Sequence, residues 1–293
     1  MINTSTIGQG YFFYSNNIFE PSWVLDVSLN LGVMNSVTDL GGSKSDQSGL
    51  KPYILRTSKP TGGISLTASH HDWVAFRFDM VAGRIESHDS LLSDASHYSS
   101  IGRFERNLNF RSSIFEFSVG GEIHPLMLRN YQINNRNLPR FSPYLTLGVG
   151  IAFFTPKALY GSEWIKLQPL RLEGQGFTEY PEREPYRTQT ITFPMGVGLR
   201  YEVNSALYVR GEIMHRLTQT DYLDDVSNGD WVDPNLFYKY LSVADADLAS
   251  KLYNRSKKVN PPRNTRPRGN EKNNDVFWSA QLRIGFVLNR KRG

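Results

Sequence analysis

The sequence predicts an all-β fold, an eight-stranded antiparallel transmembrane up-and-down barrel with long external loops. Two observations predict it. Segments of roughly ten residues or more alternate between apolar and polar side chains, and the connections between these segments alternate between long and short. A pleated strand sends successive side chains to opposite faces, so each segment has one apolar face and one polar face.

The alternation is clearest in the first and last segments. In residues 23–33 Trp and aliphatic side chains alternate with Asp, Ser, Asn and Gly, and in residues 278–288 apolar side chains alternate with Ser, Gln, Arg and Gly. The fourth segment loses its alternation near Ser113, which predicts a β-bulge there. Eight segments can be counted, at about residues 22–35, 62–70, 73–86, 107–124, 142–155, 187–203, 206–219 and 276–288.

The lengths of the connections predict the orientation of the barrel. Long loops follow the odd-numbered strands (36–61, 87–106, 156–186 and 220–275), whereas the turns at 71–72 and 204–205 are tight and the 125–141 connection is of medium length. Membrane barrels have short periplasmic turns and long external loops. We therefore expect an N-terminal periplasmic extension (1–21), the barrel (22–288) with its longest external loop at 220–275, and a basic tail (289–293).

The polar faces of the strands carry charges of both signs. An eight-stranded barrel has room inside only for side chains, and an unpaired buried charge is costly, so we expect an ion-pair network in the lumen. A ligand site or a proton path in the same place is the alternative. The residues that the strand phases place inside are Asp26, Arg77, Asp79, Glu116, Glu122, Arg200, Glu202, Arg210, Glu212, Arg216 and Arg283.

A soluble barrel would reverse the two faces, and alternation alone does not say which face is outside. Aromatic residues near the strand ends favour the membrane, because interfacial girdles form there: Trp23, Trp73, Tyr144, Tyr201 and Trp278. No run of about 18 or more apolar residues is present, so no transmembrane helix is expected. We expect the outer membrane of a Gram-negative-type cell, with both termini periplasmic and no signal peptide in the opening MINTSTIGQG.

Composition narrows the possible chemistry. The 293 residues include no Cys, which excludes disulfides, thiol catalysis and Cys-based zinc sites, and the net charge of +5 gives no reason to expect nucleic-acid binding. None of the six His residues has a carboxylate at the spacing of metal ligands or a catalytic triad. We therefore expect a non-enzymatic protein with no cofactor and no metal.

The stretch TDYLDDVS (220–227) groups three carboxylates directly after the seventh strand. Asp and Ser side chains there can bond backbone N–H groups and fix the turn into the longest loop, and calcium binding is the alternative. EGQG (173–176) ends a neighbouring external loop, so we expect the two stretches to pack together as a cap over the barrel mouth. The residues of this loop-folding signature are Asp221, Tyr222, Asp224, Asp225, Ser227, Glu173 and Gln175.

A basic run lies within the longest loop. Between residues 251 and 272 the Lys and Arg residues are opposed by Glu271 alone. Such a run is typical of a solvated loop. Docking to an acidic surface, such as lipopolysaccharide or a partner protein, is the alternative.

Several stretches resemble the PorG-like outer-membrane barrels of the Bacteroidota type, which are associated with the type IX secretion system. They are RNLNFRSSIFEFSVGGEI (106–123), PKALYGSEWIKLQPLRLEGQG (156–176), FPMGVGLRY (193–201), TDYLDDVS (220–227), LASKLYNRS (248–256) and RGN (268–270). The resemblance runs from the first strand to the C-terminus. It implies a structural or assembly component of a secretion machinery, either the secretion-linked member or a paralogue with another role.

The secretion-linked member is similar to a membrane anchor that associates with a periplasmic ring of PorK- and PorN-like proteins. The resemblance therefore implies docking through periplasmic parts of this chain, with Arg129, Arg136 and Arg140 as candidate contacts. The expected partners are outer-membrane lipid, lipopolysaccharide and envelope proteins of the secretion complex, and no nucleic acid. A small-barrel enzyme of the outer membrane and a passive pore or ligand-binding barrel remain alternatives.

Overall fold

A computed structural model describes residues 18–19, 22–40, 57–92, 104–132, 140–227, 230–256, 268–269 and 273–292. Within these residues, eight long strands form the body of the molecule: β2 (Trp23–Val37), β3 (Lys59–His70), β4 (Val74–His88), β5 (Asn109–Ile123), β6 (Phe141–Tyr160), β8 (Gln189–Glu202), β9 (Leu207–Thr218) and β10 (Val276–Val287). Each overlaps one of the predicted segments. β6 runs furthest past its predicted end, because its continuation forms a hairpin with β7 (Glu163–Lys166).

The eight strands close into a barrel. Neighbours are antiparallel, in the ring order β5–β4–β3–β2–β10–β9–β8–β6, and β6 pairs back onto β5. This closure leaves no unpaired edge among the long strands. The predicted fold class, an eight-stranded antiparallel up-and-down barrel, is therefore confirmed.

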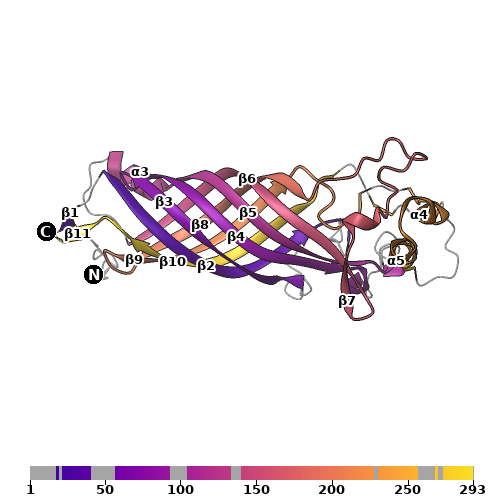
Figure 1. Cartoon of the computed structure of the whole chain (residues 1–293). Coiled ribbons are helices and arrows are strands. Elements are labelled where there is room, and N and C mark those ends of the chain that lie inside the picture. The colour runs from indigo at the N-terminus through magenta and orange to yellow at the C-terminus, as the bar shows by residue number, and fades with distance from the viewer. Residues whose placement is uncertain are drawn as a thin grey trace, which may run out of the picture.

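The two ends of the barrel are built differently (Figure 1). One end, here called the terminal end, carries α3 (Pro125–Gln132) and a small sheet of β1 (Ile18–Phe19) and β11 (Lys291–Arg292). The opposite end, here called the cap end, carries α4 (Asn235–Tyr240) and α5 (Val243–Tyr253). The N- and C-terminal segments thus meet at one end, and the helices of the longest loop stand at the other.

Apolar side chains cover the outside of the barrel. On β2, Leu29 and Leu31 expose 58% and 74% of their surface, while the polar side chains of Ser28 and Asn30 beside them are buried. The same alternation recurs along the other long strands. A contiguous exposed apolar belt of this kind suits a hydrocarbon environment, not water. Among the residues placed by the structure, no helix is long and apolar enough to cross a membrane.

The β-bulge predicted near Ser113 is wrong. β5 pairs with β4 over its whole length without a break, and buried and exposed side chains alternate through this point. What changes is the content of the lumen: the inward residues Phe110 and Ile114 are apolar, whereas Glu116 and Glu122 further along are charged. In the sequence, this change from apolar to polar filling looks the same as a change of strand phase.

The connections at the cap end fold into a second layer with its own core. Phe177 is central to it, because its ring stacks on Tyr240 at 4.3 Å and meets Phe237 edge-on at 6.2 Å. The 156–186 and 220–275 connections both contribute to this core, so two distant loops stabilise each other. Its buried members are Ala158, Leu167, Leu170, Leu172, Phe177, Val232, Phe237, Ala246, Ala249, Leu252 and Tyr253.

Candidate functional site

A network of ion pairs crosses the lumen. Nη1 of Arg77 on β4 lies 2.6 Å from a carboxylate oxygen of Glu212 on β9, and these two strands stand opposite each other in the ring of eight. The same guanidinium contacts Asp79 at 2.7 Å and Glu122 at 2.6 Å. Arg283 joins the network through Asp79 at 3.0 Å and Glu212 at 2.5 Å. One arginine therefore bonds three carboxylates across the full width of the barrel.

A second group of ion pairs surrounds Asp26. One of its oxygens lies 3.5 Å from Arg200 and 3.7 Å from Arg210, and the other accepts a hydrogen bond from the Tyr208 hydroxyl. Arg200 also bonds Glu202 at 2.6 Å. On the cap side of these pairs, Arg216 bonds Glu116 at 2.6 Å. The structure thus places every residue predicted to face the lumen in at least one ion pair.

Two tyrosine rings fill the space between these charges. The ring of Tyr208 lies over Gly285, where a Cβ atom would come within 1.9 Å of it, and the ring of Tyr144 lies over Gly198, where the distance would be 2.2 Å. The Tyr144 hydroxyl donates to Glu212 at 2.9 Å and the side chain is only 2% exposed, so the prediction that Tyr144 belongs to an outward aromatic girdle is wrong. Glycine is needed at these inward positions because only a bare backbone leaves room for the rings.

Nearer the cap end, apolar side chains fill the lumen, which the strand periodicity did not predict. Leu40, together with Leu223 and Val226 of the TDYLDDVS stretch, packs onto inward residues of the strands. We call this cluster the mouth plug. Its strand members, each 2% exposed or less, are Met34, Val81, Ile85, Phe110, Ile114, Ala152, Phe154 and Phe277. The sequence did carry a signal for it, namely apolar residues on the inward phase at the cap-side ends of several strands.

Asp224 of TDYLDDVS and Asp275 hold the plug in place by bonding backbone N–H groups. Asp224 accepts from the N–H of Leu40 at 3.0 Å and from that of Val226 at 2.9 Å. Asp275, which no sequence motif singled out, accepts from the N–H of Leu223 at 2.9 Å. These carboxylates therefore fix the loop that enters the barrel mouth.

Aromatic contacts add to this loop. Tyr222 stacks on Tyr186 with ring centroids 4.3 Å apart, and the Tyr186 hydroxyl donates to Asp225. Asp225 itself adopts a left-handed backbone conformation, with φ of 66°. Asp tolerates this conformation better than most residues do, so the third carboxylate also serves the turn.

The EGQG stretch contacts TDYLDDVS directly. A carboxylate oxygen of Glu173 accepts from the N–H of Ser227 at 3.1 Å and from Arg268 at 2.5 Å. The Gln175 side-chain oxygen accepts from the N–H of Glu173 at 3.2 Å. The Arg268 carbonyl in turn accepts from Arg106, whose side chain also bonds the Asp39 carbonyl at 3.0 Å. Buried charge-assisted bonds therefore join four connections at one junction.

Glycine is required at two points of this junction. Gly174 has a φ of 74°, and a Cβ there would lie 2.8 Å from the Tyr180 ring. Gly269 approaches TDYLDDVS so closely that a Cβ would lie 2.7 Å from the Ser227 carbonyl oxygen. The EGQG and RGN stretches thus have structural explanations, a left-handed turn in one and a close backbone approach in the other.

The junction buries more carboxylates than it neutralises. Burial, together with the neighbouring carboxylates of Asp39 and Asp224, raises the pKa of Asp221 to about 8. Burial also raises the pKa of Asp225 to about 8, against the opposing effect of Arg268. Among the described residues, no three His, Asp or Glu side chains are arranged to hold a metal ion. Asp224 and Glu173 accept hydrogen bonds from backbone N–H groups of the loop, and Asp225 accepts from the Tyr186 hydroxyl.

The terminal end holds the candidate docking residues. Arg129 is exposed on α3, the Arg140 carbonyl accepts from the N–H of Glu202 at 2.9 Å beside β8, and Arg136 lies outside the described residues. Pairing of Ile18 with Arg292 joins the N-terminal extension to the basic tail at the same end. The structure therefore gathers β1, β11 and α3 at one end of the barrel (Figure 1).

One Ser–His–Glu contact occurs in the lumen that sequence spacing did not reveal. Nδ1 of His124 lies 2.8 Å from the Ser142 hydroxyl, and Nε2 lies 3.4 Å from Glu122. All three are 3% exposed or less, and the carboxylate already accepts from Arg77 and Arg210. A nucleophile needs a substrate within reach. These three side chains lie among the packed side chains of the lumen.

No family model matches the chain, and no curated protein matches its sequence. It is similar to solved outer-membrane proteins at low identity. For Neisserial surface protein A the TM-score is 0.36 at 9% identity, covering 92% of this chain and 98% of that one. For a major outer membrane protein from Thermus thermophilus the TM-score is 0.38 at 10% identity, covering 90% and 99%. The fold rests on the strand pairing of the chain itself, and the resemblance to PorG-like barrels stays a prediction from the sequence.

Proposed function

We propose that the protein is a non-enzymatic outer-membrane barrel that anchors other envelope proteins, as a structural or assembly component of a type IX-like secretion machinery. The observation that carries this proposal is the filled lumen. Cross-barrel ion pairs such as Arg77–Glu212, the rings of Tyr144 and Tyr208 and the mouth plug occupy the interior. A barrel filled in this way is suited to work through its two ends, by binding other molecules there.

The exposed apolar belt supports the membrane location. Its residues face outward on every long strand, with charged residues confined to the lumen and to the two ends. Closed barrels with this distribution span outer membranes. We place the terminal end in the periplasm, because the tight turns at 71–72 and 204–205 lie between the strands that meet there.

The positions of the resembling stretches support a structural role. TDYLDDVS, EGQG and RGN, which barrel physics alone does not dictate, all meet at the cap junction through Glu173 and Arg268. We infer that these stretches serve loop folding, and the bonds that the Glu173 carboxylate accepts from the Ser227 N–H and from Arg268 support this role. In this proposal the cap is the folded external face of an anchor, and the terminal end is its docking face.

The docking face has a direct test. A tagged full-length chain is purified from native membranes, and co-purifying proteins are identified by mass spectrometry. We expect PorK- and PorN-like ring proteins with the wild type and at least about tenfold less of them when Arg129, Arg136 and Arg140 are all replaced by Glu, because charge complementarity sets docking.

Lys166→Glu is the matched control, because it reverses one exposed charge on β7 at the cap end. This variant should recover the ring proteins as the wild type does. Equal recovery with the triple arginine variant would contradict docking through the 125–141 connection. Absence of any ring protein from the wild-type sample would contradict the secretion role.

A further inference from the structure

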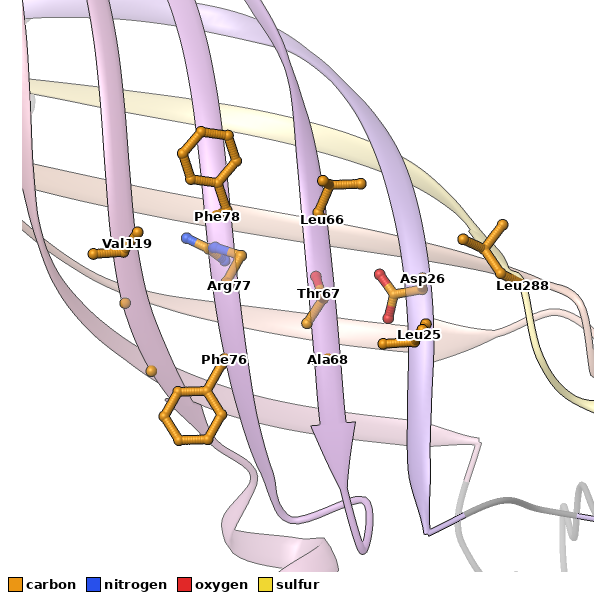
Figure 2. Close-up of a pocket in the computed structure, with 12 residues that line it drawn as sticks. Leu25, Asp26, Leu66, Thr67, Ala68, Phe76, Arg77, Phe78, Val119 and Leu288 are labelled. Atoms are coloured by element: carbon orange, nitrogen blue, oxygen red, sulfur yellow. The ribbon is translucent and has the colours of Figure 1, made fainter.

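A pocket is hollowed into the outer wall of the barrel near the terminal end (Figure 2). Its volume is about 620 Å³, within the range of roughly 300–1,000 Å³ found for small-ligand sites. Asp26 and Arg77 line the pocket through their backbone, because their side chains point into the lumen and belong to the ion-pair network there. The apolar side chains that face the pocket are Leu25, Leu66, Phe76, Phe78, Val119 and Leu288.

The pocket exists because two outward positions carry small residues. Ala68 of β3 and Gly121 of β5 are the direct partners of Phe76 on β4, one on each side of it. A Cβ at Gly121 would have its nearest neighbour 3.9 Å away, whereas at Gly120, which faces inward, it would meet a carbonyl oxygen at 2.6 Å. Packing therefore demands glycine at position 120 and leaves open space at position 121.

We propose that this wall pocket binds one acyl chain of a membrane phospholipid. The inference rests on the proposed membrane location, because the pocket is continuous with the exposed apolar belt. Phe76, 61% exposed, stands between the two small residues, and Phe78, 36% exposed, lies at the next outward position of β4, level with Leu66 and Val119. Moving one methylene group of an acyl chain from water into such a site contributes about 0.8 kcal/mol. A chain that enters the pocket from the surrounding lipid gains less, because only its closer packing against the pocket walls is new.

Amphipathic residues stand at the terminal-end rim of the pocket. The Trp23 ring lies 6.3 Å from the Phe76 ring and 4.5 Å from that of His70, which sits at the tight turn. Trp and His with one polar edge suit the level of lipid head groups, so the polar end of the phospholipid would lie beside them.

The size of the pocket favours a lipid chain over a protein partner. Twelve residues line the pocket. A stable protein interface uses about 20–30 residues on each side. A slot of this extent, formed across four neighbouring strands, matches a single flexible chain and not a folded surface.

Filling the pocket tests the proposal. Gly121→Phe places a ring in the open space without a backbone clash, and Gly211→Phe is the matched control. Gly211 also faces outward, on β9 in the opposite wall, where the nearest atom to a Cβ would be Leu282 at 4.0 Å. The full-length proteins are titrated in detergent micelles with dipalmitoylphosphatidylethanolamine, and retained lipid is counted by native mass spectrometry.

We expect one retained phospholipid on the wild type and on Gly211→Phe, and at least about tenfold weaker retention on Gly121→Phe, because the inserted ring displaces several methylenes. Equal retention on all three proteins would overturn the proposal, as would wild-type protein that retains no phospholipid. The wild type is also titrated with free palmitate. Retention of palmitate but not of the phospholipid would overturn the choice of ligand. Flotation of the wild type with liposomes of the same lipid, in parallel, separates failure of the pocket from failure of the membrane location.

Discussion

Among single residues, the buried carboxylates of the cap make its stability depend on pH. Asp221 has a pKa of about 8 in the folded cap, against about 3.9 for an unperturbed Asp. A folded-state pKa above the unfolded value means that the folded cap binds a proton which the unfolded loop releases. Stability is therefore greatest below about pH 4 and falls as the pH rises to about 8. The raised pKa of Asp225 acts in the same direction.

We expect limited proteolysis of the cap to be at least about tenfold faster at about pH 8.5 than at about pH 5, because each unit of the raised Asp221 pKa that lies between these two pH values corresponds to a change of up to about tenfold in the opening equilibrium. Asp221→Asn removes one titrating group and should reduce the ratio of the proteolysis rates at the two pH values. The reduction should come from slower proteolysis at the higher pH. Asp247→Asn, an exposed change on α5, should leave the ratio as in the wild type. An Asp221→Asn protein with the wild-type ratio would show that another group sets the pH dependence.

At the scale of elements, periodicity predicts which face of a single strand points into the lumen. It does not predict contacts that side chains from several strands make with one another. The alternation along β2 or β10 is enough to place Asp26 or Arg283 inside, because each strand has only two faces. It does not reveal what fills the lumen at each level. The mouth plug joins five strands to Leu223, and its inward apolar residues, such as Phe110 and Ile114, are the reason why the alternation predicts a bulge near Ser113 that the strand pairing does not contain.

The junction of the cap was predictable only in part for the same reason. The sequence indicates that Asp224 serves a turn, because short polar side chains bond nearby N–H groups. Its second bond, to the N–H of Leu40, spans 184 positions in the chain and has no local signal. The contact between Glu173 and Arg268 is likewise visible only once the loops are folded.

Helix α5 offers a prediction for one element. The Ser242 hydroxyl accepts from the N–H of Asp245 at 3.2 Å and donates to its carboxylate at 2.8 Å, which caps the first turn. We expect Ser242→Ala to destabilise α5 by about 1 kcal/mol, seen as about fivefold faster amide hydrogen exchange in the helix. Ser250→Ala, in the helix interior, should not speed exchange, because Ala is the better helix former there. Unchanged exchange in Ser242→Ala would mean that tertiary contacts alone hold the helix.

For the whole molecule, the order of layers along the barrel axis predicts which layer closes the barrel to ions. Charged pairs and tyrosine rings fill the lumen, the mouth plug covers them, and the second core with α4 and α5 lies outside the plug. The outer layer is therefore not needed for closure. Replacing residues 228–267 by a short Gly–Ser linker removes α4 and α5 but keeps TDYLDDVS, Arg268 and every lumenal side chain.

We expect neither the wild type nor this linker variant to conduct ions in planar bilayers, because eight-stranded barrels with packed interiors leave no aqueous path. An open general porin in the same bilayers provides the positive control, and insertion is verified by protease protection of the belt. Steady conductance steps from the wild type would contradict a filled lumen and favour the pore alternative. Conductance steps from the linker variant alone would show that the outer cap, and not the filled lumen, closes the barrel to ions. The mouth plug would then serve folding and not closure.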